Sequence, residues 1–293
     1  MARPRRSWII LIIAGLCGLA LALQWISTPL AEPLISPLQD YWHYLPLINN
    51  GQSAPQPTPT PNPNAIIVDH RAPLGFPDMP DFARLGAIQT RLLVRHASVG
   101  SNISDGLDCL GGDYPTIPGC ESYAPGTFDR SSWDFQNRGN PGWQAKIDDF
   151  VAATSASSGA YDAFSMKFCY IDALGDASPS WEAYRVALLQ LEAAYPDKTI
   201  IWWTIPLTSG GNPGADRFNE LVRQYAREHG KVLFDIADIE AHDPDGNYLT
   251  NPAGDEILFA GYTEDGGHLN WPGRIRVAQA FWVLLARLNG WFW

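Results

Sequence analysis

The sequence is poor in positive charge, in cysteine and in histidine. Its 293 residues carry 20 lysines and arginines against 31 aspartates and glutamates, with only four cysteines and six histidines. A formal net charge of −11 argues against nucleic acid and anionic lipid headgroups as partners of the folded part. Four cysteines are few for a chain of this length, and we find no internal repeat. The sequence therefore has to fold around a hydrophobic core.

One long hydrophobic run is present, at residues 7–26, and it contains no charged residue. As a helix, at ~1.5 Å per residue, it is long enough to cross a ~30 Å hydrocarbon core. Arg3, Arg5 and Arg6 precede it and predict that the N-terminal tip stays in the cytoplasm. We expect residues 1–26 to form this tip and a transmembrane signal-anchor, with the remainder extracytoplasmic at the cell membrane. A cleaved signal peptide is the alternative, and it would give a secreted protein.

Residues 27–65 have the composition of a tether. Tyr41 and Trp42 lie among prolines, which is typical of a juxtamembrane segment near the headgroups. Every second residue from Pro55 to Pro63 is proline, so this stretch is expected to act as an extended, semi-rigid spacer. The composition then changes, and residues 66–293 are long enough for one domain with a single large core.

The cysteines outside the apolar run differ in their surroundings. Cys169 lies in a strand-like stretch and is expected to be a buried free thiol. Cys109 and Cys120 flank a loop rich in glycine and proline, and outside the cytoplasm we expect them to form a disulfide. Their spacing and the lack of paired histidines near them argue against zinc. We predict neither a metal nor a cofactor.

Strand-like and helix-like stretches alternate along residues 66–293. The apolar strand-like stretches are 91–96, 133–137, 161–171, 199–207 and 231–236. Between them, residues 144–153, 180–195 and 215–229 place apolar side chains at helical spacing, and an amphipathic helix follows His268. This alternation predicts an α/β fold, a three-layer α/β/α sandwich with a mainly parallel five-stranded sheet. The carboxyl ends of its strands should gather the functional side chains at one edge.

Three residues have the types and the order of a nucleophilic site. Ser98 follows the strand-like residues 90–96, at the position where open α/β sheets place their chemistry. Asp265 and His268 are separated by two glycines, so the carboxylate can bind the imidazole Nδ1–H and leave Nε2 free as a base. We predict that these three side chains meet, although Ser98 as a turn residue and Asp265 as a helix cap remain alternatives.

The chain resembles the SGNH (GDSL-type) hydrolases at three places. The letters HAS, ending at Ser98, stand where that family has Gly-Asp-Ser after its first strand. The letters NRGNPG, ending at Gly142, resemble the second block, and DGGH, from Asp265 to His268, matches the final Asp-x-x-His block. The third block of the family, Gly-x-Asn-Asp, has no clear counterpart in SMKFCYIDALGD.

The resemblance implies roles for these residues. Ser98 would be the nucleophile, His268 its base and Asp265 the partner of the imidazole, while the N–H groups of Ser98 and Gly142 would bind an oxyanion. The family's third oxyanion donor is the missing asparagine, which leaves three candidates here: Asn140, Asn102 and the hydroxyl of Tyr170.

The resemblance also implies a function. We expect a serine esterase or deacetylase that acts on a small-molecule or polysaccharide ester, and we expect a monomer. Two alternatives stay open. One is an acyltransferase, and the other is a non-catalytic module on the same fold that binds carbohydrate or another surface.

Overall fold

The computed structural model describes residues 62–173 and 175–292. The expected membrane anchor at residues 7–26 and the tether up to residue 61 lie outside these ranges. Within them, no helix combines the length and the apolar character that a membrane span requires.

A parallel sheet of six strands forms the centre of the described part. The strands are β1 (Ile66–Val68), β2 (Leu92–His96), β3 (Trp133–Asn137), β4 (Ala163–Met166), β5 (Thr199–Trp203) and β6 (Val232–Phe234). They lie in the order β1-β6-β5-β4-β2-β3, and each neighbouring pair is parallel. The central strands β4 and β5 are almost entirely buried, because helices cover both faces of the sheet.

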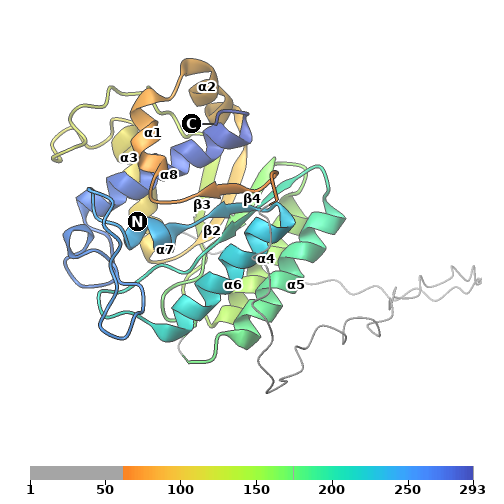
Figure 1. Ribbon diagram of the computed structural model, residues 1–293. Helices are drawn as coiled ribbons and strands as arrows, with labels where there is room; N and C mark the ends of the chain where they lie inside the picture. The colour runs from red at the N-terminus through yellow and green to blue at the C-terminus, as the bar shows by residue number, and fades with distance from the viewer. Residues whose placement is uncertain (1–61, 174, 293) are drawn as a thin grey trace, which may run out of the picture. The chain divides into compact units, whose positions relative to one another are not determined.

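Helices pack on the two faces and give the predicted three layers (Figure 1). One face is covered by α1 (Ala72–Gly75), α2 (Asp81–Gln89), α3 (Val99–Leu110), α7 (Ile236–Glu240) and α8 (Trp271–Leu288). The other is covered by α4 (Trp143–Ser157), α5 (Ser178–Ala194) and α6 (Pro213–His229). Short 3₁₀ turns lie at η2 (Phe76–Asp78) and η3 (Ala260–Tyr262). Each face of the sheet packs against its own cluster of apolar side chains, and the two clusters together form the core.

The prediction of five strands was wrong by one. The additional strand, β1, pairs with β6 at the edge of the sheet, with Ile66 opposite Val232 and Val68 opposite Phe234. It has only three residues and follows directly on the proline-rich stretch, so no alternation of side chains reveals it in the sequence. The sheet is also entirely parallel rather than mainly parallel. Each strand is joined to the next strand in sequence by a helix or a long connection, which lets the two run in the same direction.

Candidate active site

Ser98 occupies a sharp turn between β2 and α3. Its backbone has φ 55° and ψ −118°, and it is the one non-glycine residue with positive φ in the described part of the chain. Such a conformation costs on the order of 1–3 kcal/mol, and strained residues of this kind gather at functional sites. A serine held on a strained strand-to-helix turn presents its hydroxyl at the carboxyl edge of the sheet.

Gly100 makes this turn tight. A Cβ atom at position 100 would lie 2.5 Å from Cβ of His96, the last residue of β2. The start of α3 can therefore fold back over the end of the strand only if residue 100 has no side chain. Further along, the N–H of Ser101 donates to the carbonyl of Ser98 and begins the helix.

A chain of two hydrogen bonds joins the three predicted residues. The hydroxyl of Ser98 lies 2.7 Å from Nε2 of His268, and Nδ1 of His268 lies 2.7 Å from Oδ2 of Asp265. Because the carboxylate can only accept, Nδ1 carries the proton and Nε2 accepts from the serine. This is the arrangement in which an imidazole can remove the hydroxyl proton while the carboxylate stabilises the resulting positive charge.

The loop around Asp265 holds its carboxylate in place. Oδ1 accepts hydrogen bonds from the backbone N–H groups of Gly267 and His268, at 2.9 and 2.7 Å. These backbone bonds, with that from the imidazole, hold the pKa of Asp265 well below its usual range. The side chain is 58% exposed, so hydrogen bonding rather than burial fixes its charge. The carboxylate therefore stays ionised when the imidazole takes up a proton.

Asn102 links α3, the helix that begins after Ser98, to the loop that carries His268. It lies on α3, one turn after Ser98, and its buried Oδ1 accepts from the N–H of Leu269 at 3.1 Å. The resemblance to the SGNH hydrolases made Asn102 one candidate for the third oxyanion donor. This contact with the residue after His268 links α3 to the loop that carries Asp265 and His268.

A pocket of about 280 Å³ opens beside Asp265 and His268, with Trp271 and Arg274 in its wall. The guanidinium of Arg274 lies 4.8 Å from the centre of the Trp271 ring. The ring of Tyr114 packs on the same indole, with centroids 4.9 Å apart. The site therefore has an open, aromatic wall next to the histidine. Sequence reasoning did not assign these residues, because their proximity depends on the fold.

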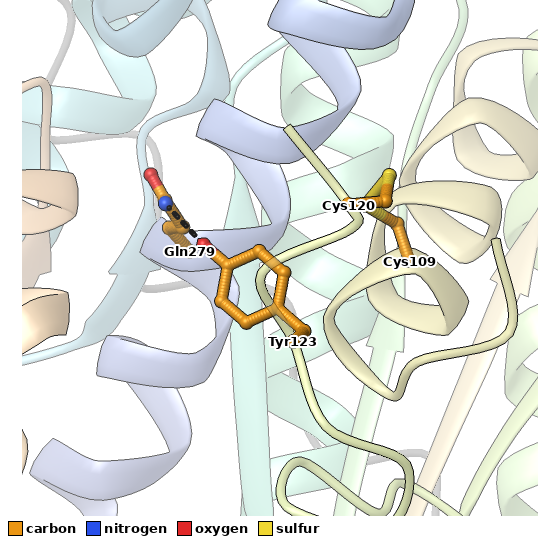
Figure 2. The surroundings of a disulfide bond; sticks show 4 residues. All are labelled: Cys109, Cys120, Tyr123 and Gln279. Atoms are coloured by element: carbon orange, nitrogen blue, oxygen red, sulfur yellow. Dashed lines mark hydrogen bonds between the residues drawn. A yellow bond between two sulfur atoms is a disulfide. The ribbon is translucent and has the colours of Figure 1, made fainter. Parts of the chain in front are cut away.

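The predicted disulfide is present, and the loop that it closes contributes Tyr114 to the packing on Trp271. Cys109, in the last turn of α3, is bonded to Cys120, while Cys169 is a buried free thiol, as expected. Figure 2 shows the bridge beside α8, where Gln279 donates to the Tyr123 hydroxyl at 3.1 Å. The loop closed by the bridge carries Tyr114, so the covalent link restrains the ring that supports Trp271.

The residues predicted to bind an oxyanion lie in different surroundings. Tyr170 lies beside the triad, with its ring centroid 6.3 Å from that of His268. Gly142 is the N-cap of α4, and its N–H, like that of Ser98, has no acceptor among the described residues. Gly142 and Asn140 are exposed, and neither contacts the triad through a hydrogen bond in the described ranges. A Cβ at position 142 would meet nothing within 4 Å, so no crowding requires glycine there.

Charged and polar side chains are buried near the Ser98 turn. Burial lowers the pKa of His96 to about 4 and that of Lys167 to about 8. The ammonium of Lys167 donates to the carbonyl of Phe168 at 2.9 Å, whereas the nearby Asp172 pairs with Lys146. His96 is therefore neutral near pH 7, and it lies under the turn rather than in the proton-transfer chain.

No family model and no curated protein matches the chain in sequence. Solved structures with a similar course of the chain include a protein of the lipolytic G-D-S-L family from Desulfitobacterium hafniense, at 13% identity and a TM-score of 0.41, covering 66% of this chain and 99% of that one. A carbohydrate esterase of family 3 from Talaromyces cellulolyticus has 16% identity and a TM-score of 0.44, covering 67% and 95%. An acetylxylan esterase from Geobacillus stearothermophilus has 15% identity and a TM-score of 0.39, covering 67% and 94%. These likenesses are partial, and the roles of residues rest on the geometry described above.

Proposed function

We propose that this chain is a serine hydrolase that cleaves carboxylic esters, with Ser98, His268 and Asp265 as its catalytic triad. The observation that carries the proposal is the continuous hydrogen-bonded path from the Ser98 hydroxyl through the imidazole to the Asp265 carboxylate. The strained backbone of Ser98 supports the same proposal. Glycine adopts this conformation without steric cost, so a position that served only as a turn would favour glycine over serine.

The reaction follows from the protonation states. The Ser98 oxygen attacks the ester carbonyl while Nε2 of His268 takes its proton, and Asp265 stabilises the imidazolium. The imidazolium then gives this proton to the departing alcohol, and the acyl group stays on Ser98. A water molecule, deprotonated by the same nitrogen, attacks the acyl carbon. The carboxylic acid leaves, and the proton returns to Ser98.

Two backbone donors are available for the oxyanion. The N–H groups of Ser98 and Gly142 have no acceptor among the described residues and follow the carboxyl ends of the neighbouring strands β2 and β3. We assign them to the developing negative charge on the carbonyl oxygen. As the third donor we favour the hydroxyl of Tyr170 over the amide of exposed Asn140, because the tyrosine ring lies beside His268.

The open wall beside the histidine favours a small-molecule or polysaccharide ester. Trp271 offers an aromatic ring next to the triad, and the flat faces of sugars and acyl groups pack on such rings. Asp265 and His268 line this pocket, so a substrate bound in it would lie beside the imidazole. We further propose that the domain acts outside the cytoplasm, tethered through residues 7–26.

A fluorophosphonate probe tests the proposal without knowledge of the substrate. The full-length protein in detergent should be labelled at Ser98 and should hydrolyse short acyl esters. Ser98→Ala should lose both activities. Ser101→Ala, one turn along the same helix, should keep both and serves as the matched control. Unlabelled and inactive wild-type protein, over a broad panel of acyl esters, would favour the binding module.

A further inference from the structure

Lys167 is a buried lysine without a carboxylate partner. It follows β4 directly, and its side chain is fully buried. The other three lysines of the chain each pair with an aspartate or a glutamate. In the described part of the chain, no carboxylate oxygen lies within 4.0 Å of the Lys167 ammonium. Burying an ammonium without such a partner is costly, and groups held at such a cost gather at functional sites.

A short chain of contacts leads from this ammonium to the residue before Ser98. Nζ of Lys167 lies 3.8 Å from Sγ of Cys169, and that sulfur lies 4.0 Å from the carbonyl oxygen of Ala97. An ammonium can only donate and a carbonyl can only accept, so Nζ donates to the sulfur and the thiol donates to the carbonyl. All three residues are buried, so bulk water does not compete for these contacts.

The carbonyl of Ala97 and the N–H of Ser98 belong to one peptide group. In a planar trans peptide these two groups point in opposite directions, so a donor to the carbonyl lies across the peptide from an acceptor of the N–H. The Ser98 N–H has no acceptor among the described residues and is one of the two backbone donors that we assign to the oxyanion. Hydrogen bonds in a row polarise one another, so a cation on the carbonyl side makes this N–H a stronger donor.

We propose that Lys167, through Cys169, positions and polarises the peptide group whose N–H, that of Ser98, binds the oxyanion. Both are positioning residues, because they are buried and do not touch the substrate. The role depends on the proposed function, since only a hydrolase with Ser98 as nucleophile forms this oxyanion. A stronger donor at Ser98 also offsets the missing asparagine of the third block, which has no counterpart in the stretch that contains Lys167 and Cys169.

The surroundings of Lys167 keep it a cation near pH 7. Burial is the main cause that lowers the pKa of Lys167 to about 8. Two neighbouring cations, Arg138 after β3 and Lys146 on α4, also lower this pKa. Cys169 and Glu240, on α7, raise it. Arg138 also donates from its guanidinium to the carbonyl of Lys167 at 2.6 Å, which places a second positive charge at the same end of the sheet.

Steady-state kinetics of the full-length protein in detergent, with a short acyl ester, tests this role. Lys167→Met removes the charge at similar size, and Cys169→Ala removes the thiol between the charge and the carbonyl. We expect each to lower kcat about 10-fold and to leave KM unchanged, because the weakened donor matters once the carbonyl oxygen becomes negative. Cys169→Ser keeps a donor and an acceptor at this place and should retain kcat within about 3-fold of the wild type.

Inhibition by a trifluoromethyl ketone adds a measurement that a merely structural role would not change. The Ser98 oxygen bonds to the ketone carbon, its proton passes to His268, and the ketone oxygen becomes an oxyanion. The Ki should therefore rise about 10-fold in Lys167→Met and Cys169→Ala, in step with the fall in kcat. Ser165→Ala is the matched control, because it removes a buried hydroxyl of β4 that has no hydrogen-bond partner among the described residues. It should keep the wild-type kcat and Ki.

Fluorophosphonate labelling of Ser98 separates this role from the proposed function. Circular dichroism shows whether each variant has folded, and Cys169→Ala keeps the test decisive if Lys167→Met has not. A labelled, active wild type whose folded variants Lys167→Met and Cys169→Ala keep its kcat and Ki would overturn the role of Lys167 alone. An increase in KM without a fall in kcat would do the same. A wild type that is neither labelled nor active would overturn the proposed function, and this role with it.

Discussion

At the scale of single residues, the conformation of Ser98 has a consequence for stability. Glycine adopts φ 55° and ψ −118° without steric cost, whereas alanine carries the same Cβ atom as serine. We therefore predict that Ser98→Gly raises the free energy of unfolding by about 1 kcal/mol and that Ser98→Ala does not, although both are inactive. Urea denaturation of the three proteins measures this. Equal stability of the glycine and alanine variants would show that the turn is not strained.

The Asp265 carboxylate should act through the tautomer of His268. In Asp265→Asn the side-chain oxygen can still accept from the N–H groups of Gly267 and His268. Its NH₂ group then faces Nδ1 and favours the tautomer that cannot accept the serine proton. We expect kcat to fall on the order of 10⁴-fold with an unchanged fold.

Asp197→Asn is the matched control for Asp265→Asn, because this exposed carboxylate precedes β5 at the opposite edge of the sheet. It should keep full activity in the same acyl-ester assay. Full activity in Asp265→Asn as well would remove the aspartate from the catalytic unit.

Glu240 should make the stability of the protein depend on pH. Burial raises the pKa of its carboxyl to about 8 from 4.5, against the opposing effects of the Leu207 N–H and of Lys167. An acid with a raised pKa in the folded state contributes stability below pH 4.5, and this contribution is lost as the pH rises toward 8. Glu240→Gln should therefore become more stable relative to the wild type between pH 5 and pH 8, by roughly 3 kcal/mol.

The measurement is urea unfolding of both proteins at these two pH values. Exposed Glu228→Gln, on α6, controls for the loss of one negative charge. Glutamine at position 240 can still accept from the Leu207 N–H, which is 2.6 Å from Oε2 in the wild type. A stability difference between the Glu240 variant and the wild type that does not change with pH would show that the carboxyl ionises normally.

At the scale of elements, the loop after α3 combines a covalent and an aromatic restraint. The Cys109–Cys120 bridge has a sequence separation of 11, for which chain-entropy models give roughly 2.5–3 kcal/mol. We predict that replacing both cysteines by serine lowers the free energy of unfolding by about this amount. The double variant should also have a higher KM, because Tyr114 then supports Trp271 less firmly.

Thiol titration checks the bridge directly. Denatured but unreduced protein should show two reactive thiols of the four in the sequence, and reduction should expose the other two. Four reactive thiols before reduction would contradict the bridge. An unchanged KM in the double variant would show that the loop does not shape the pocket.

The elements also show what sequence patterns can and cannot predict. Residues 215–229, expected as a helix, correspond to α6 from Pro213 to His229, because an apolar stripe and the Asn212 cap define its face and its start. The start of α3 was not predicted. The residues around Ser98 have turn character, and the helix begins there only because Gly100 lets it approach His96. Tertiary contact, which no local pattern encodes, decides that boundary.

At the scale of the whole molecule, the meeting of Ser98, Asp265 and His268 was predictable because the loops that follow parallel strands gather at one edge of the sheet. Ser98 and His268 are 170 residues apart, yet the rule that loops at strand carboxyl ends converge was enough to bring them together. The stacking of His70 on His242 was not predictable, because β1 was not recognised as a strand. Without it, nothing places His70 beside α7, and the stacked rings exist only through the pairing of β1 with β6.

The final prediction concerns where the whole molecule resides. An uncharged run over residues 7–26, preceded by three arginines, should hold the full-length protein in the membrane with its domain outside the cytoplasm. Replacing Ile13 and Leu16 by lysine places two charges near the middle of the run, and each costs about 2.5–3.5 kcal/mol in a bilayer. This double variant should not insert, whereas Ser53→Lys in the tether should behave as the wild type. Fractionation with mass spectrometry of the mature N-terminus measures this. A soluble extracytoplasmic wild-type protein that begins after residue 26 would identify the run as a cleaved signal peptide.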